Sequence, residues 1–454
     1  MKNIFTVLFL SLMIYGLHAQ TPKWTNYDYN SSNYSLTSTF CVAADPQSNN
    51  IWIGTNRSIV KFNQTNTWTV YDNSNTGGGM PNDNVYDMFV TSTGSVWFCT
   101  YGSGFNYYNG VSLWVNKTPS TTSNSMPTNY TYCMTQDNGG NFWVGIYSGN
   151  NSNTGLVKWD GANTWTPFTF RESTTGNYKN VESIAADNQG NIWCGTAIGV
   201  FKYNSQGTLL ASYTKENTSG GLCGNYVRSI GVNPATGDVW FGCMDKDPVT
   251  GYWIEGGASK LNGTTWTSYK PSGGGLTNGY VSAFAFKGSD VYVGTGFCGQ
   301  YSGHGLYKLS GTTWTNYYND PNTYNSTCVN DMAVDKNGNL WIAGANILSK
   351  LDFNPTAVDE KEELPSAYKL DQNYPNPFNP ETVISYQLPA GGKVRLSVTD
   401  LLGREVGLIV DEFQSAGTHN AKLSIQNYQL SSGVYFYKLQ TEKYSEVKKM
   451  VVMK

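Results

Sequence analysis

Charged residues and histidine are scarce in this sequence. Only 13% of its 454 residues are Lys, Arg, Asp or Glu, roughly half the fraction found in an average soluble domain. Exposed helix faces are normally rich in Lys and Glu, so this shortage argues against a predominantly helical protein. The net charge of −3 leaves no basic footprint for nucleic acid, and no nucleic-acid partner is expected.

Only three histidines occur, and His304 is the one in the large repetitive part of the chain. A Ser-His-Asp arrangement there would depend on that single residue. The sequence contains no His-Glu-x-x-His, Cys-x-x-Cys or Gly-x-x-x-x-Gly-Lys motif, so zinc and nucleotide sites lack support. We therefore expect no cofactor and no metal, and the sequence identifies no catalytic residue.

Long apolar runs are absent after the N-terminus, so no transmembrane segment is expected. At the N-terminus, Lys2 precedes an apolar run from Ile4 to Leu12 that is too short to span a bilayer. Ala19 is a suitable last residue before cleavage. These features predict a secretory signal peptide over residues 1–19.

Aromatic residues and glycine, in contrast, are abundant, with 32 Tyr, 14 Trp and 49 Gly. So many aromatics can bury a large core, which argues against disorder, and they favour β-structure. One apolar motif recurs seven times, with its aromatic residues 45 to 52 positions apart. The seven copies are IWIGT from Ile51, VWFCT from Val96, FWVGI from Phe142, IWCGT from Ile192, VWFGC from Val239, VYVGT from Val291 and LWIAG from Leu340.

Each motif predicts a strand buried on both faces, as in a sheet packed between two other sheets. A further strand precedes each motif, a third follows it, and most repeats add a fourth, such as WTVY from Trp68. The seventh repeat lacks this fourth strand, yet WTNY occurs at Trp24, before the first repeat. We therefore predict an all-β fold: a seven-bladed β-propeller over residues 20–351, closed by its own N-terminal strand.

The repeat resembles that of two-component-regulator propellers. The resemblance rests on the pattern Val-x-x-Ile-x-x-Asp-x-x-Gly-x-Ile-Trp-x-Gly-Thr, which is almost complete from Val181 to Thr196, while Tyr292 and Ala343 depart from it. That family includes sensor ectodomains and secreted proteins. Since no kinase, transmembrane or DNA-binding part accompanies the repeats in this sequence, the resemblance implies the fold and not signalling.

A second module follows the repeats. The last 103 residues hold 24 of the 61 charged residues, and no Trp or Cys. Residues 352–366 contain the acidic run from Asp359 to Glu363 and are predicted to be a solvated linker. Alternating apolar segments separated by glycine turns predict a small antiparallel, immunoglobulin-like β-sandwich over residues 367–454.

This second module resembles the type A C-terminal sorting domain of the type IX secretion system. The matching segments are LDQNYPNPFNPET from Leu370, VRLSVTDLLGREV from Val394, AGTHNAKLS from Ala416, LSSGVYFYKL from Leu430 and KKMVVMK from Lys448. The resemblance implies passage through the periplasm to the outer-membrane surface or the medium, with the secretion machinery and its sorting protease as partners. The residues assigned to the sorting signal are Pro375, Pro377, Gly433, Lys448, Lys449 and Lys454. We also expect the terminal strand to offer backbone pairing groups to a receptor.

The connections between strands are short on one face of the predicted ring and long on the other. Insertions gathered on one face indicate that a binding site, if present, lies there. The candidate rim residues are Tyr147, Asp245, Asp247, Tyr252, Trp253, Glu255, Phe297, Tyr301 and His304, and Tyr101 lies on the same face. Aromatics amid Asn, Ser and Gly suit stacking on sugars or contact with a protein, and packing within the loops is the alternative.

These features favour a secreted or surface-displayed propeller that binds an extracellular glycan or protein without catalysis. One alternative is a polysaccharide lyase or glycosidase that uses Asp245, Asp247 or Glu255. The same cluster also suits a calcium site, and a solvated loop is the third interpretation of it. A structural or adhesive surface protein is the other alternative. The scarcity of His and Glu favours binding over catalysis.

Eight cysteines in an exported protein permit disulfides. Cys99, Cys194 and Cys243 lie in predicted core strands, where a free Cys behaves as a small hydrophobe. Four cysteines map near one rim, and two pairings are considered there: Cys223 with Cys243, and Cys298 with Cys328. The sequence leaves the pairing open.

Overall fold

The structure is a computed structural model, and it divides into two compact units, residues 1–354 and 355–454. The residues it describes are 22–28, 31–32, 36, 38–147, 155–168, 180–247, 249–250, 252–271, 275–298, 303–318, 323–355, 367–414, 416–428 and 430–453. The predicted signal peptide and most of the predicted linker lie outside these residues. Within the described part of the chain, no helix is long and apolar enough to cross a membrane.

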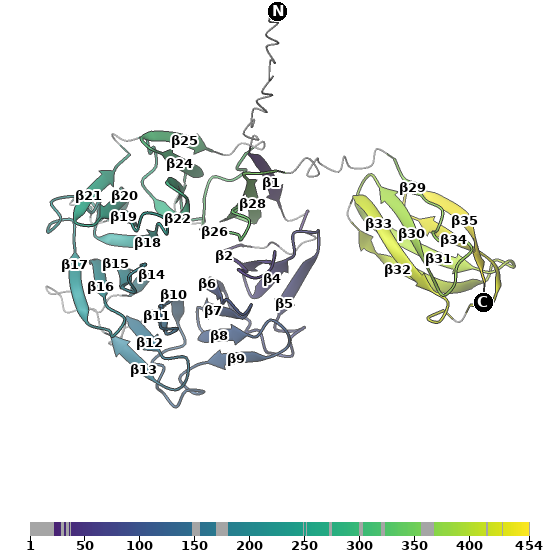
Figure 1. Cartoon of the computed structure of the whole chain (residues 1–454), viewed down its shortest axis with the longest axis horizontal. Coiled ribbons are helices and arrows are strands. Elements are labelled where there is room, and N and C mark those ends of the chain that lie inside the picture. The colour runs from purple at the N-terminus through teal and green to yellow at the C-terminus, as the bar shows by residue number, and fades with distance from the viewer. Residues whose placement is uncertain are drawn as a thin grey trace, which may run out of the picture. The chain divides into compact units, whose positions relative to one another are not determined.

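The first unit is a ring of seven four-stranded antiparallel sheets, as the repeats predict (Figure 1). The innermost strands are β2 (Cys41–Ala44), β6 (Val85–Val90), β10 (Thr131–Gln136), β14 (Val181–Ala186), β18 (Tyr226–Val232), β22 (Val281–Lys287) and β26 (Asp331–Val334). The second strands coincide with the seven apolar motifs: β3 (Ile51–Gly54), β7 (Val96–Thr100), β11 (Phe142–Ile146), β15 (Ile192–Thr196), β19 (Val239–Lys246), β23 (Asp290–Thr295) and β27 (Leu340–Gly344).

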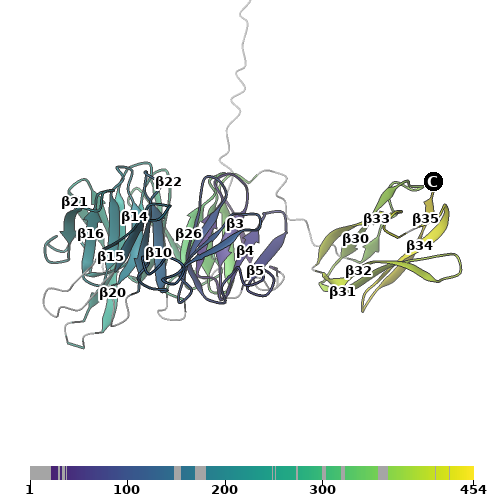
Figure 2. The same cartoon turned by 90° about the horizontal axis from the view of Figure 1, so that it is seen from below.

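The two outer layers of each blade follow in chain order. The third strands are β4 (Ser58–Phe62), β8 (Phe105–Tyr108), β12 (Leu156–Trp159), β16 (Gly199–Tyr203), β20 (Trp253–Asn262), β24 (Leu306–Ser310) and β28 (Ile347–Asp352). The outermost strands are β5 (Trp68–Asp72), β9 (Trp114–Lys117), β13 (Trp165–Phe168), β17 (Leu209–Tyr213), β21 (Thr265–Tyr269), β25 (Thr313–Tyr317) and β1 (Lys23–Tyr27). Figure 2 shows the ring from the side, with the strands running between its two faces.

The N-terminal strand closes the ring, as predicted. β1 pairs antiparallel with β28, with Trp24 opposite Leu351, and becomes the fourth strand of the last blade. The Tyr27 ring stacks on Trp341 at a centroid distance of 6.0 Å. The first and last parts of the propeller are therefore joined by backbone pairing and by aromatic packing, which leaves no unpaired sheet edge at the junction.

Five of the seven second strands are buried along their whole length, and β19 and β23 are buried except at one end, because each blade is covered by a neighbour on both sides. Glycine in this strand allows the close approach: a Cβ at Gly195 would lie 2.5 Å from Ser183 Oγ and 2.8 Å from the carbonyl oxygen of Val227 in the next blade. The turn aspartates also bond to the core. Asp187 Oδ2 accepts a hydrogen bond from the indole N–H of Trp193 at 2.9 Å.

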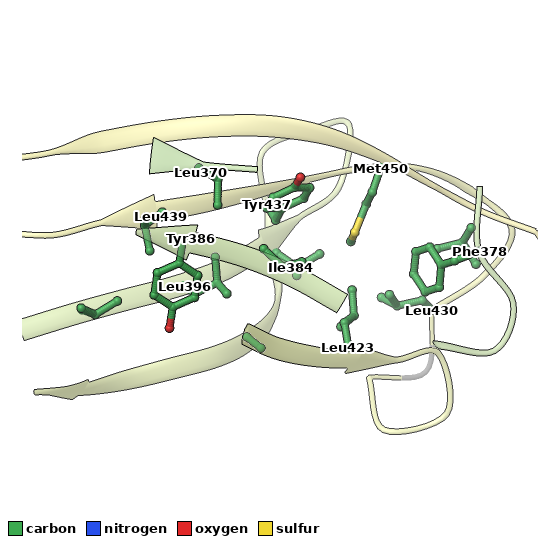
Figure 3. Close-up of a cluster of buried hydrophobic side chains, with 14 of the residues drawn as sticks. Leu370, Phe378, Ile384, Tyr386, Leu396, Leu423, Leu430, Tyr437, Leu439 and Met450 are labelled. Carbon is green, nitrogen blue, oxygen red and sulfur yellow. The ribbon is translucent and has the colours of Figure 1, made fainter. Parts of the chain in front are cut away.

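The second unit is a two-sheet sandwich. One sheet has the order β29 (Lys369–Leu370), β30 (Glu381–Leu388), β33 (Gly417–Ser424), and the other has the order β32 (Glu405–Gln414), β31 (Gly392–Thr399), β34 (Gly433–Gln440), β35 (Ser445–Val452). The alternating apolar segments of the sequence form the six long strands, β30 to β35. Side chains from both sheets, including Tyr386, Tyr437 and Met450, form one buried core (Figure 3).

The C-terminal end of the outer edge of β35 is covered within the domain, so this part of the strand does not offer the pairing groups that we expected. The N–H of Phe378 donates to the Val451 carbonyl at 3.0 Å, and the N–H of Val451 donates to Asn376 Oδ1 at 2.9 Å. The proline-rich segment therefore pairs with the terminal strand within the domain. Its fixed, extended backbone suits this role, because proline restricts the chain to such conformations.

Candidate functional site: the axial cavity

The seven innermost strands surround a cavity of about 350 Å³ on the axis of the ring. Each of these strands is the end strand of its sheet, so its free edge faces the cavity. One residue per blade, near the start of the innermost strand, lines the mouth of the cavity. These seven mouth residues are Phe40, Tyr86, Tyr132, Glu182, Arg228, Ser282 and Asn330.

A β-bulge aims most of the mouth residues inward. In the second to sixth blades, the pairing between the two inner strands shifts at this position, for example between Val227 and Ser229. The bulged residue, Arg228 in that blade, has no partner in the ladder. Bulges re-aim side chains and are frequent beside functional sites. The mouth is thus built from one variable side chain per repeat.

Aromatic side chains form one wall of the mouth and continue to the surface. The ring of Tyr86 lies 5.3 Å from Phe40 and stacks on Tyr132 at 5.1 Å. Tyr86 also contacts Tyr101 at 5.8 Å, and Tyr101 contacts Tyr147 at 6.0 Å. Tyr101 and Tyr147 are 42% and 41% exposed. We call the residues Phe40, Tyr86, Tyr132, Tyr101, Tyr130 and Tyr147 the aromatic strip, and it offers a continuous stacking surface from the cavity to solvent.

An ion pair forms the next part of the wall, on the fourth and fifth blades. Arg228 Nη1 lies 3.2 Å from Glu182 Oε2 and also donates to the hydroxyl of Tyr226. The guanidinium lies 4.5 Å from the centroid of the Phe297 ring. Burial raises the pKa of Glu182, while the positive charge of Arg228 opposes the shift. The pair therefore holds a partly desolvated cation at the cavity wall.

Two aspartates lie deeper in the cavity and bridge neighbouring blades. Asp87 accepts from the N–H of Met134 at 2.6 Å, and Asp331 accepts from the N–H of Val42 at 2.9 Å. Burial raises the pKa of Asp87 to about 8, and the nearby Asp331 carboxylate adds to the shift. Burial also raises the pKa of Asp331, to about 6. Asp87 is therefore largely protonated at neutral pH.

One disulfide borders the cavity. Cys298 and Cys328 are bonded, as one of the two pairings considered from the sequence, and the N–H of Cys298 donates to Asn330 Oδ1. The other pairing is not formed: Cys223 and Cys243 are both free and buried. The Cys243 thiol lies 3.9 Å from Ser259 Oγ instead.

Three predicted rim residues connect to this cavity. Tyr147 belongs to the aromatic strip, and Phe297 lines the cavity beneath Arg228. Phe297 is only 9% exposed, so it is a wall of the cavity and not the exposed rim aromatic that we expected. Trp253 packs on Tyr226 at 4.5 Å, because the long hairpin of β19 and β20 folds back over the start of β18. It supports the residue that hydrogen-bonds Arg228.

The predicted acidic cluster lies on that hairpin, outside the cavity. Asp245 forms an ion pair with Lys215 at 2.5 Å. Asp247 accepts from the N–H groups of Val249 and Thr250, and these hydrogen bonds lower the pKa of Asp247. Glu255 lies opposite Met244 in the β19–β20 pair. Asp245 and Asp247 thus have structural partners. These contacts favour the interpretation of the segment as a solvated loop.

The remaining candidates are spread over the face. Tyr252 is 76% exposed at the tip of the same hairpin. His304 Nδ1 lies 2.9 Å from Thr277 Oγ1, and its ring packs against Tyr318. Tyr301 lies outside the described residues. Within the described ranges, no group of three His, Cys, Asp or Glu side chains is arranged to hold a metal ion.

The sorting-signal residues lie along three segments of the sandwich. Pro375 accepts a hydrogen bond from Thr382 through its carbonyl, and Pro377 precedes the buried Phe378. Gly433 begins β34, while Lys448 and Lys449 lie on β35. Lys448 pairs with Glu446 at 3.3 Å. Lys454 lies outside the described residues.

Most of the mouth residues were not predicted from the sequence, although the repeat contains a signal for them. In five blades the mouth residue follows the first Val of the repeat, and that position is occupied by different types: Tyr86, Glu182, Arg228, Ser282 and Asn330. A position that varies inside an otherwise regular repeat, on the strand nearest the axis, is where a ring-shaped protein can specify a ligand.

The comparisons with known proteins agree with this architecture. Residues 372–453 match the family described as a secretion system C-terminal sorting domain. Residues 79–102 and 323–346 match the family described as a two component regulator propeller. No curated protein sequence matches the chain.

Solved structures are similar in fold at low sequence identity. One is the extracellular domain of the putative hybrid two component system BT3049 from B. thetaiotaomicron, with 17% identity and a TM-score of 0.55, covering 95% of this chain and 58% of that one. Another is the extracellular domain of the putative one component system BT4673 from B. thetaiotaomicron, with 14% identity and a TM-score of 0.49, covering 92% and 57%. An ancestral GH74 enzyme gives 14% identity and a TM-score of 0.51, covering 93% and 60%.

The chain spans less than two thirds of the length of each of these structures. At such identities the likeness concerns the fold, while the family matches concern the two modules. The chain is thus an all-β protein in which a seven-bladed propeller of the two-component-regulator type is followed by a type IX secretion system C-terminal sorting domain.

Proposed function

We propose that this protein is a non-catalytic binding module, displayed on the cell surface or released from it, that recognises an extracellular glycan through the axial cavity and the aromatic strip. The observation that carries this proposal is the continuity of the aromatic strip. Stacked or tilted rings lead from the cavity wall at Tyr86 to the exposed rings of Tyr101, Tyr130 and Tyr147. Partly exposed tyrosines suit the apolar faces of sugar rings, while their hydroxyls reach the sugar hydroxyls.

The cavity supplies the polar half of such a site. Ser282, Asn330 and the two aspartates line it, together with the Arg228–Glu182 pair. Ligand sites commonly combine a concave apolar wall with a few fixed polar groups that set orientation. The volume of about 350 Å³ falls at the lower end of the range for such sites. It suits one sugar unit with the rest of the glycan along the strip.

The acids in the loops argue for binding over hydrolysis. A glycosidase needs one carboxyl group held protonated beside a second one that is ionised. Asp247 has a lowered pKa and Asp245 is paired with Lys215, so neither aspartate is suited to donate a proton. In the cavity, Asp87 is held protonated near Asp331, but both oxygens of each side chain accept hydrogen bonds from backbone N–H groups of two blades, which ties these two groups to the fold.

The sorting domain marks the chain for export to the cell surface or beyond. We infer that a signal peptide over residues 1–19 directs the first step, into the periplasm, and that the sorting protease removes the C-terminal domain. The propeller would then face the extracellular medium, where polysaccharides and the surfaces of other cells are the available ligands.

A glycan array with the purified protein and a Tyr101→Ala variant tests this function. Tyr101 is exposed, so its removal should leave the fold unchanged, while binding to the best glycan should weaken about tenfold or more. Tyr374→Ala is the matched control, because Tyr374 is an 82% exposed tyrosine of the sorting domain. The proposal is contradicted if no glycan binds, or if both variants bind like the original protein.

A further inference from the structure

The free edges of the innermost strands bring one backbone N–H per blade to the axis. In the fourth blade, the N–H of Asp187 donates to the Asn191 carbonyl, and hydrogen-bonded pairs then alternate up the β14–β15 ladder. This alternation leaves the N–H of Ile184 pointing away from β15, toward the cavity. The same register places an N–H of every other blade in the same position: Val42, Met88, Met134, Ile230, Phe284 and Met332.

Carboxylates of the chain itself occupy four of these seven donors. Asp87 accepts from Met88 at 2.7 Å and from Met134 at 2.6 Å. Asp331 accepts from Met332 at 2.8 Å and from Val42 at 2.9 Å. Each aspartate thus spans two adjacent blades and satisfies one N–H of each. Together they cover the seventh, first, second and third blades.

The other three blades have the same donors without a carboxylate. In the part of the chain that the structure describes, the N–H groups of Ile184, Ile230 and Phe284 meet no acceptor, and all three residues line the cavity. At the position where the second and seventh blades carry Asp, these three blades have Ser183, Ser229 and Ala283, while the first and third blades have Cys. Ile184 is buried and Ile230 and Phe284 are partly buried, so these three adjacent N–H groups are available to an acceptor that enters the cavity, either water or a ligand.

Two side chains at the same arc favour a negatively charged acceptor. Arg228, on the fifth blade, holds its guanidinium at the mouth above this arc. Ser282, on the sixth blade, is 91% buried and its Oγ has no hydrogen-bond partner among the described residues, although it lines the cavity. A carboxylate offers two oxygens that accept from N–H, O–H and guanidinium groups together.

We propose that the axial cavity binds a carboxylate, carried by an acidic sugar unit of the glycan, in the arc formed by the N–H groups of Ile184, Ile230 and Phe284. This inference rests on the proposed function and names its ligand class. The ligand carboxylate would make the contacts that Asp87 and Asp331 make in the other blades, with Arg228 and Ser282 in addition. The aromatic wall of Tyr86 and Tyr132 on the other side receives the sugar face.

The charge of the cavity is compatible with an anion. Asp87 is largely protonated at neutral pH, since burial raises its pKa to about 8. The Asp331 carboxylate is already held by two N–H groups of the seventh and first blades. Arg228 is on the fifth blade, so a guanidinium lies at the arc with free donors, where it is shared with the Glu182 carboxylate at 3.2 Å.

Isothermal titration of the full chain with trigalacturonic acid and with its carboxyl-reduced, neutral counterpart tests this assignment. We expect the acid form to bind about tenfold or more tightly than the neutral form, because charge-assisted hydrogen bonds are the stronger class. Glu182→Gln with Arg228→Gln removes both charges at once, which avoids a lone buried charge. This double variant should lose the preference for the acid form.

Two further variants keep the test decisive. Lys308→Gln with Asp290→Asn neutralises a comparable ion pair of 2.7 Å on the sixth blade, outside the cavity, and should keep the preference. Ser282→Ala removes the unpartnered hydroxyl without leaving a buried polar group, so it should fold and bind the acid form several-fold more weakly. If the double variant fails to fold, the binding of the acid and neutral trimers by Ser282→Ala decides whether the carboxylate site exists.

The outcomes separate this inference from the proposed function. Equal binding of the acid and neutral trimers, or an unchanged preference in both cavity variants, overturns the carboxylate site. If neutral glycans still bind and Tyr101→Ala weakens them, the proposed function stands without it. A tripeptide with a free carboxyl end, tested beside its amidated form, shows whether the site takes a peptide carboxylate instead of an acidic sugar. Selective binding of the free peptide with no binding of trigalacturonic acid would overturn the sugar assignment.

Discussion

Asp87 on the second blade accepts a hydrogen bond from the backbone N–H of Met134 on the third blade, at 2.6 Å. Asp331 makes the equivalent bond to Val42 across the closing junction of the ring. Both bonds lie at the axis, where they tie adjacent innermost strands to each other. The aspartates are therefore structural clamps, and their protonation is linked to the stability of the propeller.

Stability should fall as the pH rises from 5 to 8. The pKa of Asp87 is raised from 3.8 to about 8 and that of Asp331 to about 6. At a pH above 3.8 and below the raised pKa, each carboxyl group has lost its proton in the unfolded chain but keeps it in the native state. Raising the pH through this window therefore favours unfolding. One pKa unit corresponds to about 1.4 kcal/mol, so we expect a loss of up to about 5 kcal/mol in the free energy of unfolding, measured by urea denaturation at each pH.

The variant Asp87→Asn with Asp331→Asn is the control for this pH dependence. It cannot titrate, so its unfolding midpoint should vary less with pH over the same window. Acids whose pKa is lowered in the native state, such as Asp247 and Asp411, act below that window. A wild-type midpoint that stays constant or rises from pH 5 to 8 would show that these carboxyl groups are not held protonated.

Replacing Trp193 by Phe should destabilise the propeller more than replacing Trp240 by Phe. Both tryptophans are 2% exposed, so the two changes remove similar packing. The Trp193 indole N–H bonds to Asp187, whereas the Trp240 indole N–H has no hydrogen-bond partner among the described residues. We expect a difference of about 1–2 kcal/mol between the variants by denaturant unfolding. Equal losses of stability in the two variants would mean that Asp187 stabilises its own turn and contributes nothing through Trp193.

Deleting β1 should open the ring. A chain that begins at residue 29 loses the backbone pairing with β28 and the contact of Tyr27 with Trp341. The free edge of β28 would then be exposed to solvent and to other chains. We expect a lower thermal midpoint and association into oligomers, followed by calorimetry and light scattering. A chain that begins at residue 22 is the control, and identical behaviour of the two chains would contradict closure by β1.

Export should depend on the exposed lysines of the terminal strand as well as on its core. Deleting residues 448–454 removes Met450 and Val452, which are buried, so it disrupts the sorting domain itself. Lys448→Ala with Lys449→Ala leaves that core unchanged. We expect this double variant to fold and to accumulate in the periplasm, as measured by cell fractionation. Secretion at the wild-type level would exclude the two lysines from the signal.

The ring and its closure were predictable from the sequence because they follow from repetition. Seven apolar motifs at similar spacing fix the number of blades, and the displaced WTNY segment at Trp24 fixes the closing strand. The sandwich was equally accessible, since its alternating segments are separated by glycine turns. These features depend on local pattern alone, which a single sequence carries.

The axial cavity was not predictable in the same way, because it combines one residue from each of seven repeats. Its mouth residues differ in type, and only the fold shows that they share one height in the ring. One irregularity in the motif does have an explanation. Cys99 and Ala343 stand where five other blades have glycine, and they pair with Asp87 and Asp331. The side chain of Cys99 or Ala343 occupies the space over the second strand, so the paired aspartate side chain extends into the cavity instead.

The most direct test of the binding account uses the backbone amides of the two isoleucines in the arc of Ile184, Ile230 and Phe284. Protein labelled with ¹⁵N-isoleucine reports Ile184 and Ile230, which Ile184→Val and Ile230→Val assign by loss of a signal. The account predicts that trigalacturonic acid shifts both amide signals, while the signals of isoleucines such as Ile51 and Ile59, which lie in β3 and β4 and do not line the cavity, stay in place. Binding of trigalacturonic acid that leaves both amide signals unmoved would contradict it.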